Sequence, residues 1–503
     1  MRRKLPVNKF VSLVFLFSLV GLYFLFSFRL TKVPPGINFD ESSIGYNASL
    51  ISDSLHDENG RFLPVFVLTL EGKDWKQPVR IYSTALLFKL LGKSYFNLRL
   101  LSVIFALGSA VIFYKILRLF FSPGISLMGF FLFATSPALM IQSHLALENI
   151  DLLPFFLLWL YFLLSYSLCP RLRKVVLAGF FLGISFYTYK GMRAMVPIYF
   201  LISLSYLAYL SLIKKQGGSR SILFFILGIA PFLLPLKLWQ IKYAGAVYDP
   251  ATTSIPSFFD AVLTYLSSFD FSFLFVLGDK MLVHSTGRQG VFLLPNVILF
   301  FLGFAQLLKE KKPWYYLIFF SLILTPLLLI TVGSIYRASR LMPYLPLATF
   351  IFTLGVKKIF EIENKLAKTL LLAFFALAIT ASYRDFLKTY WIVYPKLVSN
   401  DFSPNFDEAM RELYRLSREG DKYPYVEYND FNSYKADLQF FQEVYFPAGM
   451  KVWQREKESF PDQGLVLTTI PGSRGIVNYK EIPSVEAGQK TFFIVGKRKE
   501  EVK

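Results

Sequence analysis

The chain has 503 residues, of which 54% are hydrophobic, and it contains 55 Phe and 29 Tyr. This composition is too apolar for a soluble globular protein and is typical of a protein with several membrane spans. The formal net charge of +20 comes largely from short basic loops between apolar runs, where positive charge orients the spans in the membrane. We therefore expect the lipid bilayer, and not nucleic acid, as the partner of the basic residues.

The first apolar run covers residues 10 to 30 and follows a basic start at residues 2 to 4. It is long enough to cross a bilayer, and no convincing small-residue cleavage site precedes Pro34. These features predict a retained signal anchor with its N-terminus in the cytoplasm.

Further apolar runs of bilayer length recur as far as residue 383 and predict about eleven transmembrane helices. The runs lie at residues 10–30, 98–119, 123–142, 149–168, 174–190, 194–213, 221–239, 291–308, 314–332, 343–358 and 367–383. With a cytoplasmic N-terminus, most of the basic loops between them also face the cytoplasm, as positive charge favours.

An odd number of spans places the C-terminal segment outside the cell membrane. The prediction is a polytopic all-α transmembrane domain over residues 1–383, with its first outer loop at 31–97, and an extracytoplasmic domain over 384–503. A helical pattern at 407–417, followed by strand-like runs at 464–470 and 491–495, indicates that the second domain is small and of mixed α/β type.

Two apolar stripes at helical spacing predict two short helices in the first outer loop, lying in the membrane interface. The stripes consist of Ile44, Ala48, Ile51 and Leu55, and of Ile81, Ala85 and Phe88.

Adjacent carboxylates, Asp40 and Glu41, precede the first stripe. Acids close to the outer membrane surface suit the deprotonation of an acceptor hydroxyl or the binding of a divalent cation. The alternative is an acidic cap on the helix, which the helix dipole favours. The dipeptide alone favours the cap, and its sequence context reverses that preference.

The context is an ordered set of motifs in the outer loops. They read Pro-Pro-Gly-Ile-Asn-Phe-Asp40-Glu41, Asp57-Glu58-Asn-Gly60, Lys76-Gln-Pro78, Phe96-Asn-Leu-Arg99, Ser143-His144-Leu-Ala-Leu-Glu148, Tyr187-Thr-Tyr189-Lys190-Gly-Met-Arg193 and Arg340-Leu-Met-Pro343. This set resembles the membrane glycosyltransferases related to protein O-mannosyltransferases and to the lipid A aminoarabinose transferases.

The resemblance implies a GT-C fold enzyme that transfers a sugar from a polyprenyl-phosphate donor to an acceptor hydroxyl on the outer face of the membrane. The acceptor would be a lipid, a glycan or a protein. The resemblance also implies that Asp40, beside Glu41, is the catalytic base, that Glu148 is a second essential acid, and that Lys76 contacts the carrier phosphate.

Two positions depart from the family pattern. Relatives commonly have an arginine where His144 stands, so a fixed positive charge is replaced by a titratable one. The aminoarabinose transferases have two prolines after the lysine, whereas Gln77 intervenes here.

Several cations are further candidates for phosphate binding. Arg340 and Arg288 stand beside predicted spans on the outer side, where a guanidinium can grip a phosphate or can simply snorkel to the headgroups. Lys190 and Arg193 close another predicted span and suit either role. Asp57, Glu58 and His144 are candidate supporting residues.

All three histidines, His56, His144 and His284, fall in predicted outer regions. Imidazole and carboxylate groups suit zinc or manganese, so a divalent metal ion is left open. No ligand spacing in the sequence supports such a site, and ordinary hydrogen-bonded histidines are the favoured interpretation.

A transporter or flippase of polyprenyl-linked glycans is the alternative from another functional class. It would be expected to keep functional charges near the bilayer midplane and to show repeat symmetry. Here the conspicuous acids lie in a loop, and no internal repeat is evident.

Overall fold

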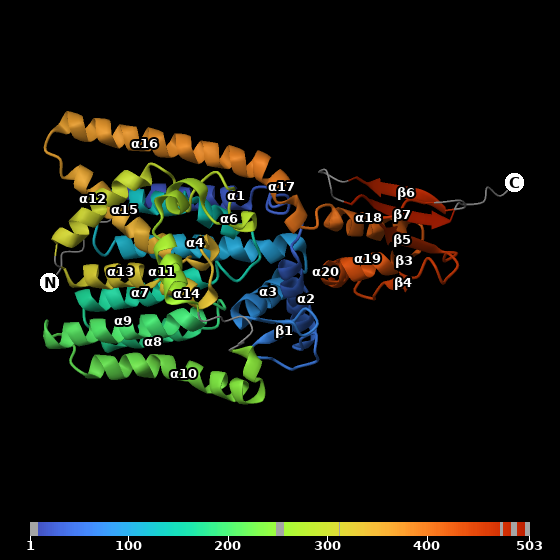
Figure 1. The fold of residues 1–503 in the computed structure, drawn as a ribbon, viewed down its shortest axis with the longest axis horizontal. Coiled ribbons are helices and arrows are strands. Elements are labelled where there is room, and N and C mark those ends of the chain that lie inside the picture. The colour runs from blue at the N-terminus through green and yellow to red at the C-terminus, as the bar shows by residue number, and fades with distance from the viewer. Residues whose placement is uncertain (1–8, 248–255, 311, 473–475, 484–489, 498–503) are drawn as a thin grey trace. The chain divides into compact units, whose positions relative to one another are not determined.

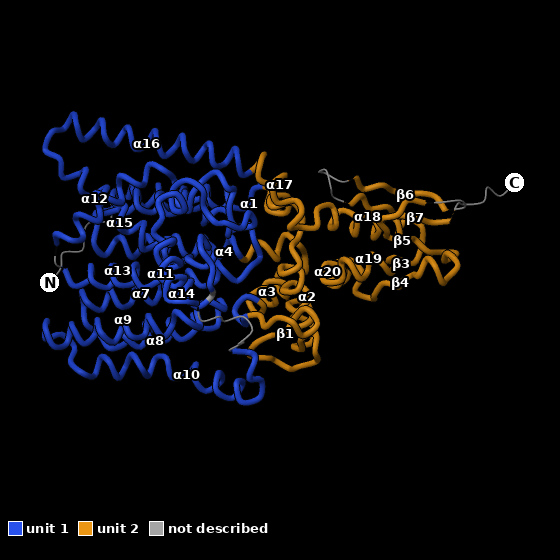
Figure 2. The backbone as a smooth tube through the Cα atoms, viewed as in Figure 1, with its two compact units in different colours: residues 1–28, 77–80, 102–390 blue, residues 29–76, 81–101, 391–503 orange. Residues whose placement is uncertain are grey.

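The structure is a computed structural model that describes residues 9–247, 256–310, 312–472, 476–483 and 490–497 (Figure 1). The basic start at residues 2 to 4 lies outside the described residues. The chain forms two compact units, coloured separately in Figure 2. Unit 1 comprises residues 1–28, 77–80 and 102–390, and unit 2 comprises residues 29–76, 81–101 and 391–503.

The predicted apolar runs all coincide with helices. These are α1 (Lys9–Ser27), α4 (Tyr95–Leu117), α5 (Pro123–Ala134), α6 (Pro137–Ser143), α7 (Leu152–Leu168), α8 (Leu172–Ser185), α9 (Met192–Leu212), α10 (Arg220–Lys242), α12 (Asn296–Lys309), α13 (Pro313–Leu324), α14 (Leu327–Val332), α15 (Tyr344–Phe360) and α16 (Lys365–Lys388). A further helix, α11 (Phe258–Ser267), precedes α12.

Within the described residues, six helices are long and apolar enough to cross a membrane, or seven when the bent pair α5–α6 counts as one span. The predicted count of about eleven is therefore not confirmed, although a multi-spanning membrane protein is. Helices such as α7 and α12 are apolar but have 17 and 14 residues. At about 1.5 Å per residue they fall short of a hydrocarbon core of about 30 Å.

Glycines allow the helices of unit 1 to approach closely. A Cβ added at Gly303 on α12 would lie 1.8 Å from the carbonyl oxygen of Ile351 on α15, and one added at Gly355 would lie 2.3 Å from the carbonyl oxygen of Leu299. Small residues at such crossings let two backbones pack directly, which drives helix association where no hydrophobic effect operates between helices.

Unit 2 contains the two helices predicted in the first outer loop. They are α2 (Phe39–Ser54) and α3 (Pro78–Leu91), of which residues 81–91 belong to this unit. Between them lies a short antiparallel hairpin of β1 (Val67–Thr69) and β2 (Asp74–Lys76).

The rest of unit 2 is the predicted small α/β domain. Its helices are α17 (Tyr394–Leu397), α18 (Phe406–Glu419), α19 (Tyr428–Ser433) and α20 (Lys435–Tyr445), and its strands are β3 (Tyr423–Glu427), β4 (Lys451–Trp453), β5 (Gly464–Thr468), β6 (Ile476–Ile482) and β7 (Phe492–Lys497). The strand order is β4-β3-β5-β7-β6. Strands β4, β3 and β5 are parallel to one another, and β7 is antiparallel to both of its neighbours, β5 and β6. The helix and both strands that the sequence predicted correspond to α18, β5 and β7.

Most of residues 31–97, the predicted first outer loop, belongs to the same unit as the C-terminal segment, and within this unit α2 packs against α20. A Cβ added at Gly45 would lie 2.6 Å from the Phe440 ring, so the absence of a side chain permits the approach. Asp437 on α20 also accepts hydrogen bonds from the hydroxyls of Ser42 and Ser403, each 2.5 Å long. Burial raises the pKa of Asp437 to about 6. The predicted boundary between residues 383 and 384 stays a prediction.

Candidate active site

The first turn of α2 carries both acids of the predicted pair, and it is closed by a capping box. The Asn38 side chain accepts a hydrogen bond from the backbone N–H of Asp40, 2.9 Å long. The backbone N–H of Asn38 in turn donates to Oε2 of Glu41 at 3.0 Å. This reciprocal pair satisfies the exposed donors of a helix start, so Glu41 is the capping acid.

Glu41 also forms a buried ion pair with Arg99 on α4, and neither side chain has any exposed surface. Arg99 donates from Nε to Oε1 at 2.9 Å and from Nη2 to Oε2 at 2.8 Å. It further donates to the carbonyl oxygens of Leu30, Pro34 and Gly36, at 2.9, 3.1 and 2.7 Å. These bonds fix the segment that enters α2, and they favour a structural role for Glu41 over a catalytic one.

Asp40 has the opposite environment from its neighbour, because 32% of its side chain is exposed. Its Oδ1 pairs with the Nζ of Lys76, the last residue of β2. Lys76 also pairs with Asp74 on the same strand, at 2.8 Å, and only 8% of its side chain is exposed. The hairpin therefore holds one ammonium group between two carboxylates, of which Asp40 is on α2.

In unit 1, Glu148 follows α6 and binds the chain directly after Lys76. Its Oε1 accepts a 2.6 Å hydrogen bond from the backbone N–H of Gln77. The half-buried Glu148 thus fixes the backbone at the position where this chain departs from the family pattern.

Two buried charges that the sequence analysis missed support the Glu148 loop. Arg80 is fully buried and donates to the carbonyl oxygen of Leu147 at 2.8 Å and to the Ser102 hydroxyl at 2.5 Å. It also pairs with the equally buried Asp151, with 3.3 Å between Nε and Oδ2. An arginine two residues after Pro78, within an apolar stripe, is the signal that could have revealed Arg80.

The Gln77 side chain is fully buried, and within the described part of the chain neither its amide nitrogen nor its amide oxygen has a hydrogen-bond partner. An unsatisfied buried polar group costs about 1–3 kcal/mol. We expect Gln77→Met to raise the free energy of unfolding by up to about that amount, measured by thermal unfolding of the purified protein in detergent.

Gln142→Met is the matched contrast for this substitution. The Gln142 amide nitrogen lies 3.0 Å from Nδ1 of His284, so the same change removes a buried hydrogen bond and should lower the unfolding midpoint. A lower midpoint for Gln77→Met would contradict the prediction and show that its amide is satisfied in solution.

The candidate phosphate-binding arginines of unit 1 lie in loops. Arg340 ends a short turn at Ala338–Arg340 and is half-buried, whereas Arg288 is exposed. Within the described ranges neither side chain forms an ion pair, in contrast to Arg337, whose Nε lies 3.8 Å from Oδ1 of Asp279. Both arginines therefore keep their charge available to an anionic ligand.

The candidate supporting residues mostly have structural partners. Arg193 donates to the carbonyl oxygen of Val247 at 2.8 Å, and Lys190 precedes it in the turn before α9. Asp57 is buried and accepts hydrogen bonds from the backbone and the Nε of Arg61, at 2.9 and 2.8 Å. Glu58 exchanges hydrogen bonds with Asn47 on α2, and burial raises the pKa of its carboxyl group.

The histidines do not meet the geometry of a metal site. His56 is exposed, with Nδ1 2.6 Å from the carbonyl oxygen of Ser54. His144 is fully buried with its ring centroid 5.4 Å from that of Tyr390. His284 is bonded to Gln142 as described. Among the residues that the structure describes, no three His, Cys, Asp or Glu side chains converge as metal ligands, so no step is assigned to a metal.

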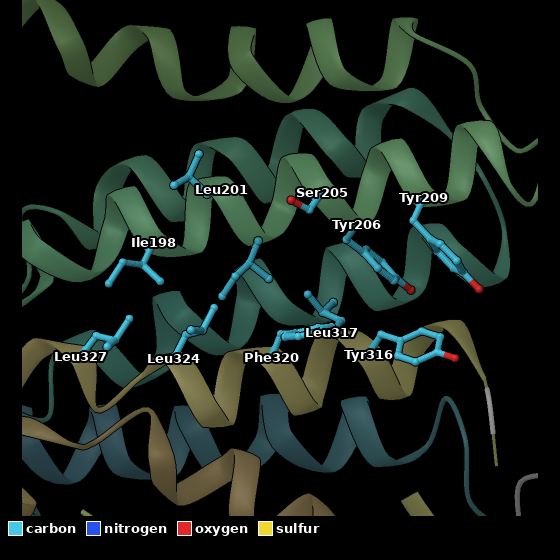
Figure 3. A pocket seen from close by; sticks show the side chains of 11 residues that line it. Ile198, Leu201, Ser205, Tyr206, Tyr209, Tyr316, Leu317, Phe320, Leu324 and Leu327 are labelled. Carbon is cyan, nitrogen blue, oxygen red and sulfur yellow. The ribbon is translucent and has the colours of Figure 1, made fainter. Parts of the chain in front are cut away.

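An apolar groove runs along unit 1 between α9 and the pair α13–α14. Its volume is about 590 Å³. Figure 3 shows that Ile198, Leu201 and Tyr206 from α9 face Leu317, Phe320 and Leu324 from α13 across this groove. Its lining is almost entirely hydrocarbon and aromatic, which suits an alkyl or prenyl chain.

Comparison with known proteins supports the predicted relationship. Residues 76–234 match the model of a family described as dolichyl-phosphate-mannose-protein mannosyltransferase. The structure is similar to the crystal structure of ArnT from Cupriavidus metallidurans bound to undecaprenyl phosphate, with a TM-score of 0.56 and 10% sequence identity over 97% of this chain and 98% of that chain. The chain has the GT-C glycosyltransferase fold.

Two further solved structures also match this chain. ArnT in the apo state gives a TM-score of 0.55 at 11% identity, over 96% of this chain and 98% of that chain. The archaeal oligosaccharyltransferase AglB from Archaeoglobus fulgidus gives a TM-score of 0.47 at 12% identity, over 86% of this chain and 64% of that chain. No curated protein matches the sequence.

The predicted resemblance is thus confirmed by the partial match to the family model and by the shared fold. The alternative of a transporter or flippase is not favoured by these matches.

Proposed function

We propose that this glycosyltransferase transfers a sugar from a polyprenyl-phosphate donor to an acceptor hydroxyl, with Asp40 as the general base. The observation that carries the assignment is the contrast between the adjacent acids. Both oxygens of Glu41 are occupied and buried, whereas Asp40 is partly exposed beside Lys76. Of the pair, Asp40 is therefore the acid that can reach a substrate.

The proposed reaction is a single displacement. Asp40 takes the proton of the acceptor hydroxyl as its oxygen attacks the anomeric carbon, and the bond between that carbon and the phosphate oxygen breaks. The configuration at the anomeric carbon is inverted. Because the departing phosphate gains charge, fixed cations stabilise the transition state more than the bound donor.

Lys76 connects donor binding to the base. In the structure its ammonium group pairs with Asp40 and Asp74. A donor phosphate that binds Lys76 competes with Asp40 for the same ammonium group, so it leaves the base free to accept a proton. Arg340 and Arg288 remain proposed phosphate contacts, since their charges have no carboxylate partner in the described chain.

In this proposal Glu41 and Glu148 do not contact the substrate but hold the backbone near the site in place. Glu41 fixes the start of α2 and hence Asp40, and Glu148 fixes the backbone at Gln77, which directly follows Lys76 in the sequence. The apolar groove between α9 and α13 is a candidate site for part of the prenyl chain. We also propose a plasma-membrane location with a cytoplasmic N-terminus and an extracytoplasmic C-terminal domain, as the basic loops favour.

Turnover of a defined donor tests this function. Purified protein is supplied with polyprenyl-phosphate mannose and with a cell-envelope lipid extract as acceptor. We expect acceptor-dependent release of polyprenyl phosphate and a glycoside whose anomeric configuration, read by NMR, is opposite to that of the donor. Movement of the intact donor between the leaflets of a vesicle without cleavage would instead identify a flippase, and retained configuration would refute a single displacement.

A further inference from the structure

The C-terminal part of unit 2 contains an open cavity of about 710 Å³, built entirely from residues 414 to 451. Its walls are the last turns of α18, the turn that leads into β3, and the segment between the end of α20 and β4. Because β3 and β4 are parallel neighbours, the cavity lies at their shared amino ends. None of the residues of the proposed reaction lines it.

Aromatic rings form a firm and accessible wall of this cavity. The Tyr414 ring packs edge-on against Phe446, with centroids 5.6 Å apart, and its centroid lies 6.1 Å from that of Tyr445. The Tyr445 hydroxyl donates to Oδ1 of Asp407 at 2.7 Å, which fixes the orientation of its ring. Tyr414 is 37% exposed and Tyr423 is 59% exposed, so both present surface to a ligand.

The charged side chains around these rings are mostly cations, and two of them form no ion pair within the described residues. Arg418 lies 5.7 Å from the Tyr414 ring centre, and Lys451 lies 5.6 Å from that of Tyr423. In the part of the chain that the structure describes, neither cation takes part in an ion pair. The lining contains one acid, Asp421, and three cations, Arg418, Lys422 and Lys451.

Two neighbouring cations, in contrast, have partners within the protein. The third lining cation, Lys422, donates to the Tyr479 hydroxyl at 2.5 Å. Arg415, one turn before Arg418 on α18, pairs with Glu412 and Glu419, both at 2.9 Å. Two cations are thus left without a counter-ion beside accessible aromatic faces.

We propose that this cavity binds a saccharide that carries a carboxylate or a phosphate group. One face of a sugar ring consists of C–H groups and packs on an aromatic face, while the tyrosine hydroxyl edge stays available for hydrogen bonds. The anionic substituent pairs with Arg418 and Lys451, whose charge-assisted hydrogen bonds are the stronger kind. The choice of a saccharide rests on the proposed function, in which the outer side of the enzyme handles sugars.

An anionic membrane surface is the competing ligand for such cations. A lipid surface is contacted by a broad exposed basic face or helix. Here the cations flank a hollow with aromatic walls, which encloses a ring-shaped ligand better than it meets a plane. The observations therefore favour the saccharide.

Binding to the full-length protein tests the proposal. The protein is placed in phosphatidylcholine nanodiscs, and tetragalacturonate, mannose 6-phosphate and neutral maltotetraose are titrated with ligand-detected NMR. We expect at least one acidic probe to bind, and maltotetraose to bind about tenfold more weakly or less. Arg418→Gln and Tyr423→Ala should each weaken binding of the acidic probe by about tenfold.

Matched substitutions outside the cavity are the controls. Arg415→Gln removes an arginine from the same helix, and Tyr428→Ala removes an exposed tyrosine of α19, and both should leave the affinity unchanged. The proposal is overturned if neither acidic probe binds, if maltotetraose binds equally well, or if the controls weaken binding as much as the cavity variants. Binding to phosphatidylglycerol vesicles is measured in parallel. The proposal is also overturned if substitution of Arg418 or Lys451 weakens binding to these vesicles but leaves binding of the acidic probes unchanged. Because the readout is binding, its failure is separate from failure of the transfer reaction.

Discussion

Asp40→Asn should lower the rate of polyprenyl phosphate release by about 10²–10⁴-fold, the usual contribution of a general base. The amide has nearly the same shape as the carboxylate but cannot accept the proton of the acceptor hydroxyl. Because Asp40 is partly exposed and caps no helix, the variant should fold normally. The measurement is single-turnover release of the lipid phosphate, combined with the thermal unfolding midpoint of each preparation.

Asp53→Asn is the matched control, since Asp53 lies on the same helix and pairs with Lys93 at 2.6 Å. Its side chain is 59% exposed, and the variant should release lipid phosphate at the rate of the unaltered protein. Equal rates in Asp40→Asn and Asp53→Asn would remove Asp40 from the reaction.

Arg99→Met should destabilise the protein by about 3–5 kcal/mol, because removing one partner of a buried ion pair leaves the other charge unpaired. Here the unpaired group is Glu41, and three backbone carbonyls lose their donor at the same time. The change should appear as a large drop in the unfolding midpoint of the detergent-solubilised protein, together with loss of turnover because α2 no longer holds Asp40 in place.

Arg415→Met provides the contrast for this effect. Arg415 forms two ion pairs of similar length on the surface of α18, with 49% of its side chain exposed. Solvent screens such pairs, so this variant should unfold at an unchanged midpoint. If Arg99→Met also unfolded at the unchanged midpoint, Glu41 would not anchor α2, and its assignment as a structural residue would fail.

Much of the architecture followed from periodicity along the chain. The apolar runs became helices, the stripes beginning at Ile44 and Ile81 became α2 and α3, and the strand-like run at 464–470 contains β5. Hydrophobic spacing reports which face of an element is buried, and that is a local property of the sequence. The predicted number of spans was not confirmed, because several apolar runs form helices, such as α7 and α12, that are shorter than a bilayer-crossing helix.

The sequence by itself determined a multi-spanning membrane protein with an acidic pair at the start of a helix and a set of motifs shared with glycosyltransferases. Only the tertiary structure decided which acid of the pair is open to a substrate, because Glu41 meets Arg99, 58 residues away, while Asp40 meets Lys76, 36 residues away. It also decided that Glu148 binds the backbone of Gln77, across 71 residues. Such contacts depend on how distant segments pack, and adjacent residues with the same chemistry carry no local signal that tells a buried carboxylate from an exposed one.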